Sequence, residues 1–192
     1  EAAAIRQNVG LIDISAFTKH IIKGPGSTKF LNWFTCNKLP RVNKINLTYA
    51  LTSTGTVRSE YTIVRKGTDE YYLISAGALT SYDQDYLVKN AQDKYEEFGY
   101  IEIQDVTSQF GSFAIAGPKS RELLKKIVTA LEPENQLSNE NFPWLSCKDI
   151  ELGMIPTLAI RVAYTGELGW ELHHPVEFQN RLFELLLAAG QE

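Results

Sequence analysis

Apolar and polar residues alternate along much of this chain, a pattern that predicts strands. Between residues 45 and 75, three alternating runs are separated by two short turns, Ser53-Thr54-Gly55 and Gly67-Thr68-Asp69. Alternating runs joined by such turns are typical of an antiparallel meander. Further strands are predicted over 20–24, 100–106, 146–152, 157–164 and 169–175.

Helical periodicity predicts helices over 27–37, 81–98 and 176–190, and another after Gly117-Pro118. Asp83 and Asp85 fall in the first turn of the 81–98 helix, where acidic residues complement the helix dipole without any further role. Strands joined by hairpins, with intermittent helices packed on one side, indicate an α+β fold. We therefore expect antiparallel sheets with flanking helices rather than a parallel α/β sheet.

A short local repeat links the two halves of the chain. The segment Ile22-Lys-Gly-Pro-Gly-Ser27 is matched by Ile115-Ala-Gly-Pro-Lys-Ser120. The match predicts two related β–Gly-Pro–α units, one in each of two α+β subdomains over 1–105 and 106–192. The polar segment 132–143 is predicted to be a long surface loop.

Composition narrows the function classes. The chain has 192 residues, 44% of them hydrophobic, and a net charge of −4. This apolar content excludes an intrinsically disordered chain. The slightly negative net charge gives no electrostatic attraction to nucleic acid or to an anionic membrane. No apolar run approaches the roughly 18 residues of a membrane span. The polar start lacks a signal-peptide core and the two cysteines fit a reducing compartment, which predicts a cytoplasmic or mitochondrial matrix location. The chain begins with Glu1, which favours a processed or excerpted sequence.

Few residues point to chemistry directly. His173-His174 are adjacent in a predicted strand and face opposite sides, so we expect no metal site there. Glu60 lies in mid-strand before an apolar run, and Glu167 lies in a glycine-rich turn between two apolar strands. A solvated strand face would explain Glu60 equally well, and ordinary hairpin chemistry would explain the Thr165–Gly169 turn.

Four stretches together resemble the aminomethyltransferase family, to which the T-protein of the glycine cleavage system belongs. They are Val9–Ser15, Leu51–Val64, Ala116–Leu124 and Arg161–Leu172. Ser59-Glu60, Asn37-Lys-Leu-Pro40 and Tyr164–Leu172 look more like the folate domains of dimethylglycine and sarcosine dehydrogenases. The resemblance implies the aminomethyltransferase folate-binding fold, truncated before the C-terminal β-barrel domain that family members carry.

The resemblance also implies an enzyme that binds tetrahydrofolate. It would capture a one-carbon unit from a small-molecule donor, an N-methyl amine or an aminomethyl donor, as 5,10-methylene-tetrahydrofolate. If the roles of the matching residues in the family apply to this chain, Glu167 would accept hydrogen bonds from the pterin N–H donors, and Glu60 would lie near folate N5 and N10. Tyr164 would contact the pterin, and Ser75 would approach the folate. The chain has no flavin fingerprint, so FAD is expected only in a parent protein, on another domain or on a partner protein.

Two other functions stay open on the sequence. One is a folate-dependent demethylase acting on another donor, such as a sulfonium compound. The other is a non-catalytic folate-binding protein; relatives of that kind carry a cysteine where this chain has Ala163.

Overall fold

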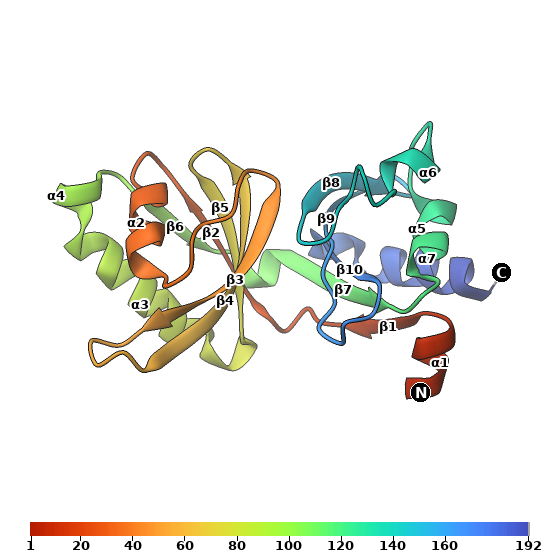
Figure 1. Ribbon diagram of the computed structural model, residues 1–192, viewed down its shortest axis with the longest axis horizontal. Coiled ribbons are helices and arrows are strands. Elements are labelled where there is room, and N and C mark those ends of the chain that lie inside the picture. Colours follow the sequence, from red (N-terminus) through yellow and green to blue (C-terminus); the bar gives the residue numbers. More distant parts are fainter. Residues whose placement is uncertain (192) are drawn as a thin grey trace. The chain divides into compact units, whose positions relative to one another are not determined.

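The computed structural model describes residues 1–191, which form two compact units (Figure 1). Unit 2 is Ala16–Thr107, and unit 1 is Glu1–Ser15 together with the chain from Ser108 onward. Each unit contains a five-stranded sheet in which every pair of neighbouring strands is antiparallel. The α+β prediction, with flanking helices, is confirmed.

The division of the chain differs from the predicted 1–105 and 106–192. Residues 1–15 belong with the second half because β1 (Gly10–Asp13) pairs with β7 (Phe110–Ala116). The register runs from Gly10 opposite Ala116 to Asp13 opposite Phe113. A pairing between strands about a hundred residues apart leaves no mark in local alternation, so the sequence pattern could not predict it.

The sheet of unit 2 has the strand order β3-β4-β5-β2-β6. The predicted meander forms its first three strands. Their bounds are β3 Lys44–Leu51, β4 Val57–Gly67 and β5 Glu70–Ser75, followed by β2 Thr18–Lys23 and β6 Glu102–Asp105. Residues Tyr61, Ile63 and Leu73 pack on one face against α2 (Ser27–Phe34) and α3 (Thr80–Asp93). Short helices at Gly77–Leu79 (η1) and Tyr95–Phe98 (α4) flank α3.

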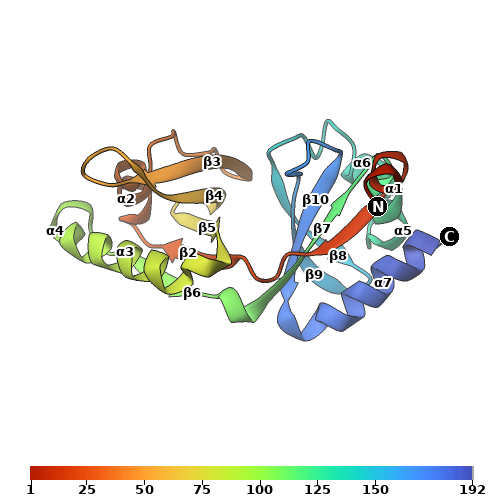
Figure 2. The same ribbon diagram turned by 90° about the horizontal axis from the view of Figure 1, so that it is seen from below.

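The sheet of unit 1 has the order β1-β7-β10-β9-β8. Its remaining strands are β8 Cys147–Leu152, β9 Ile155–Ile160 and β10 Gly169–Pro175. The helices are α1 Ala2–Gln7, α5 Ser120–Ile127, α6 Pro133–Gln136 and α7 Gln179–Gln191, with single turns at Thr107–Gln109 (η2) and Val176–Phe178 (η3). Helices α5 and α7 lie side by side (Figure 2). They cover one face of the sheet, where Trp170 and Leu172 are fully buried.

Two differences from the sequence pattern concern loops of unit 1. The predicted strand 157–164 ends at Ile160, so Tyr164 lies in the β9–β10 loop. The predicted surface loop 132–143 contains the short helix α6 and the buried Phe142. No helix among residues 1–191 has the length and apolar character needed to cross a membrane.

The two Gly-Pro joints have the same backbone geometry. Gly24 precedes α2 with φ +116°, and Gly117 precedes α5 with φ +133°, a region that L side chains rarely adopt. At Gly117 a Cβ would also fall against the backbone oxygens of Ile5 and Asn8, in the segment that leads into β1. The joint therefore lets the N-terminal segment approach the start of α5.

We expect Gly117→Ala to destabilise unit 1 by about 2 kcal/mol or more, because backbone strain and a clash with main-chain atoms add together. Gly166→Ala is the matched control: Gly166 also has a positive φ, +78°, but open space where the Cβ would stand. Its cost should stay at about 1 kcal/mol. Urea unfolding measures both, and equal costs would refute the close approach.

Candidate functional site

Glu60 lies on β4 with its side chain on the face away from α2 and α3. Its neighbours Ser59 and Tyr61 are buried, whereas Glu60 is exposed. Successive strand residues point to opposite faces, and Tyr61 packs in the core under the helices, so Glu60 must point away from them. Across the sheet it stands opposite Tyr49 on β3. Its carboxylate has no protein partner among residues 1–191 and is open to a ligand.

The other face of β4 carries a buried hydrogen-bond node centred on Asp83. Its carboxylate is fully buried and accepts hydrogen bonds from the Ser59 and Ser75 hydroxyls, the second at 2.7 Å. Asp83 thereby joins α3 to β4 and β5. Burial, and then the nearby Asp83 charge, raise the pKa of Tyr61 far above its ordinary value, so this phenol stays protonated.

Ser75 belongs to this node. Its side chain is 5% exposed, and its hydroxyl donates to Asp83. The structure therefore places Ser75 under α3 and Glu60 on the opposite face of the same sheet. The sequence pattern assigned Asp83 only to the helix dipole. It could not predict the hydrogen bonds to Ser59 and Ser75, because these residues are 24 and 8 positions away in sequence.

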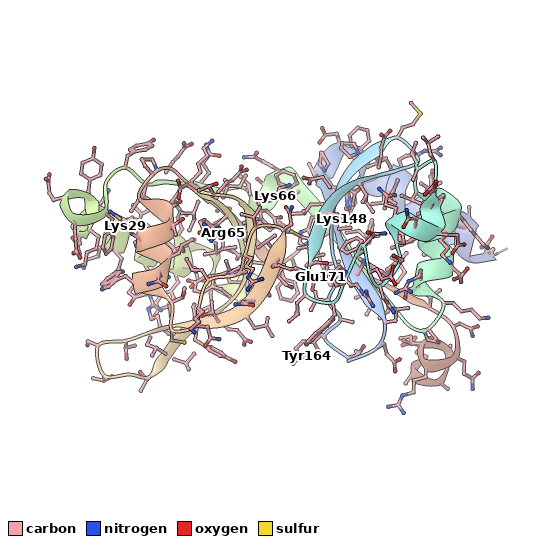
Figure 3. The ribbon with its side chains drawn as sticks, turned by 45° about the horizontal axis from the view of Figure 1, so that its top comes forward. Lys29, Arg65, Lys66, Lys148, Tyr164 and Glu171 are labelled. Atoms are coloured by element: carbon pink, nitrogen blue, oxygen red, sulfur yellow. The ribbon has the colours of Figure 1, made fainter. Side chains whose placement is uncertain are left out.

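Tyr164 and Glu167 lie in the β9–β10 loop of unit 1. Tyr164 is fully exposed and projects from the loop (Figure 3). Gly166, with φ +78°, makes the turn and donates its N–H to the Ala163 carbonyl at 3.2 Å. Glu167 is half-buried beside the start of β10. The loop can present both an aromatic ring and a carboxylate to a ligand.

The structure adds a carboxylate for which the sequence analysis gave no role, Glu171. It lies on β10, between Ala114 of β7 and Ile160 of β9, and points away from α5 and α7 (Figure 3). Its Oε2 atom is 3.3 Å from Nε2 of His173, which is 1% exposed. Glu171 is thus held on a central strand, whereas Glu167 stands in a turn. An acid and a histidine two residues apart in a strand share one face, and that spacing was visible in the sequence.

The two adjacent histidines have separate partners, as expected from strand alternation. His173 contacts Glu171, while His174 bonds Gln179 at 2.7 Å and stacks on Phe113 under the helices. Burial lowers the pKa of His174. Among residues 1–191, no group of three or more His, Cys, Asp or Glu side chains is arranged to hold a metal ion.

The sequence matches the family described as the GCVT N-terminal domain over residues 1–192. The chain belongs to this family. The aminomethyltransferase resemblance is therefore confirmed.

Three individual proteins illustrate the match. Mitochondrial dimethylglycine dehydrogenase of Mus musculus is 36% identical over 100% of this chain and 21% of its own length. An aminomethyltransferase of Listeria monocytogenes is 28% identical over 99% of this chain and 50% of its own length. The crystal structure of the glycine cleavage system aminomethyltransferase T from Bartonella henselae superposes with a TM-score of 0.79 at 21% identity, covering 96% of this chain and 47% of that one. The chain thus spans half or less of these relatives.

We expect Asp83→Asn to lower the free energy of unfolding by about 1–3 kcal/mol, because the amide offers one acceptor where two serine hydroxyls now donate. Asp85→Asn is the matched control, since Asp85 is an exposed acid on the same helix. It should change stability by less than about 0.5 kcal/mol. Denaturant unfolding followed by circular dichroism measures both. An Asp83→Asn protein as stable as the control would contradict the buried node.

Proposed function

We propose that this GCVT-family domain binds tetrahydrofolate and takes part in transferring a one-carbon unit from a small amine donor, to form 5,10-methylene-tetrahydrofolate. The family match over the whole chain carries the proposal. Each unit, taken by itself, offers candidate groups: unit 2 has the exposed carboxylate of Glu60, and unit 1 has the Tyr164–Glu171 segment. Folate, when bound, supplies the N5 and N10 amines that accept the carbon.

The acids of unit 1 fit the pterin chemically. The 2-amino-4-oxopyrimidine edge offers two N–H donors, and a carboxylate has two oxygens to receive them. We assign this role to Glu167 on the family resemblance. Glu171 is a second candidate that the geometry favours: it is held on a central strand by a buried histidine, which reduces the entropy lost on binding. Tyr164 would supply an aromatic surface next to either acid.

Glu60 is assigned to the reacting end of the folate. A carboxylate there would orient the amines and stabilise positive charge that develops as the carbon is transferred. Ser75 is buried under α3, so its proposed approach to folate is best understood as indirect, through the backbone of β5. The node at Asp83 fixes Ser59, the residue before Glu60, and so limits the movement of that carboxylate.

The oxidation of an N-methyl amine would have to occur elsewhere. No residue pattern in this chain fits a flavin, so we assign FAD and amine oxidation to another domain or to a partner protein. Dimethylglycine or sarcosine would then be the donor, in a cytoplasmic or mitochondrial matrix setting. The name of the mouse relative, a mitochondrial dimethylglycine dehydrogenase, is compatible with the second location.

Calorimetric titration of the full-length protein with tetrahydrofolate tests the pterin assignment. We expect Glu167→Gln to weaken binding by about 1–3 kcal/mol, the scale for a charged hydrogen bond, or roughly 5- to 150-fold. Glu171→Gln is measured in parallel, and Glu151→Gln, an exposed acid on β8, is the control. If only Glu171→Gln weakens binding, the role belongs to Glu171. If all three variants bind as the unmodified protein does, neither acid receives the pterin.

Turnover tests the role of Glu60. We expect Glu60→Gln to lower kcat by on the order of 10²- to 10⁴-fold, with the dissociation constant for tetrahydrofolate nearly unchanged. The assay is formation of 5,10-methylene-tetrahydrofolate from dimethylglycine or sarcosine by the full-length protein. Glu70→Gln, an exposed acid on the neighbouring strand β5, serves as the control. Full activity in Glu60→Gln would remove Glu60 from the mechanism.

A further inference from the structure

Two arginines of unit 1 converge on a single oxygen atom. Arg121, in the first turn of α5, and Arg161, directly after β9, both donate to Oδ1 of Asn139, at 2.5 and 2.8 Å. The three residues come from segments far apart in sequence. Two guanidinium groups that share one neutral acceptor carry two positive charges in a small volume.

No carboxylate offsets these charges. Among residues 1–191, neither arginine forms an ion pair with Asp or Glu. Burial, and then repulsion from Arg121, lower the pKa of Arg161, and no acidic side chain acts in the other direction. Both side chains are only half-buried, so the pair remains reachable from solvent. A pair of close cations without an anion is an unfavourable arrangement that a bound anion would relieve.

An aromatic platform fixes the pair. Both guanidinium carbons lie over the ring of the buried Trp170, 5.8 Å from its centroid for Arg121 and 5.6 Å for Arg161. The Phe142 ring packs edge-on against Trp170, and its carbonyl accepts a hydrogen bond from Nη1 of Arg161. Stacking restricts the long side chains before any ligand arrives, which lowers the entropic cost of binding.

A third cation lies on the same side of the sheet. Lys148, labelled in Figure 3, lies on β8. Its Nζ atom is 5.5 Å from the centroid of the Phe142 ring. Burial lowers the pKa of this amine, and no acidic group counters the effect. Lys148 adds positive potential around the aromatic pair, although only the arginines converge closely enough to bind one anion jointly.

We propose that Arg121 and Arg161 form a binding site for a phosphate group, either free or as a phosphate monoester. Planar guanidinium forks match the oxygens of phosphate, and a dianion balances the two charges. The site is separate from the proposed folate face, because Arg161 and Trp170 lie on the helix-covered side and Glu171 points to the other side. Asn139 occupies the position between the two arginines until the anion binds.

The test is the melting temperature of the full-length protein, measured in inorganic phosphate, glycerol phosphate and chloride at equal ionic strength and pH. We expect either phosphate compound to raise the melting temperature in a saturable way relative to chloride. The compound that saturates at the lower concentration identifies the source of the phosphate group. Arg121→Gln should weaken the apparent phosphate affinity roughly tenfold or more, as expected for the loss of a charge-assisted contact.

Arg181→Gln is the matched control, because it removes the same charge from an exposed position on α7 of the same unit. It should keep the phosphate response. Arg121 makes no bond that joins strands, so its glutamine variant should fold, and its melting temperature in chloride checks this directly. The proposal is overturned if phosphate stabilises the protein no more than chloride does. It is also overturned if the response is the same in Arg121→Gln and Arg181→Gln.

Discussion

The positions of the candidate acids are set by the two-residue alternation of antiparallel strands, because helices cover only one face of each sheet. In unit 2, this constraint places Tyr61 under the helices and forces Glu60 to the other side of β4. In unit 1, it places Trp170 under α5 and α7 and turns Glu171 away from them. A shift of either strand by one residue would bury a carboxylate in an apolar core, which is prohibitively costly. Packing of the core therefore fixes where the acids can act.

Polar interactions further restrict the strands that carry the candidate acids Glu60 and Glu171. Asp83 joins α3 to the sheet through two buried hydrogen bonds. One comes from Ser59, the residue before Glu60, and the other from Ser75, at the end of β5. His173 restrains Glu171 through a single contact of 3.3 Å between two residues of the same strand. These contacts contribute modestly to stability, but each removes freedom from a strand that carries a candidate ligand group. Restricted freedom before binding is what a ligand site needs.

Much of the fold could be predicted from the sequence, because the meander, the Gly-Pro joints and the amphipathic helices are all local patterns. The pairing of residues 10–13 with β7 could not be, since the two strands are about a hundred residues apart. The same limit applies to the sites. Glu60, Tyr164 and Glu167 stand in recognisable segments, whereas the Asp83 node and the Arg121–Arg161 pair exist only once distant segments meet. Glu171 lies in the strand predicted over 169–175, so its contact with His173 could be predicted from strand alternation, whereas the role of Glu167 rests on the family resemblance.

We propose that the protein carrying this GCVT-family domain binds tetrahydrofolate. The most direct measurement is an isothermal titration of the unmodified full-length protein with tetrahydrofolate, with 7,8-dihydroneopterin as a ligand that keeps the pterin edge but lacks the rest of the folate. We expect saturable binding of one tetrahydrofolate per chain, and weaker binding of the truncated ligand. An absence of saturable heat with tetrahydrofolate, confirmed by an unchanged melting temperature, would contradict it.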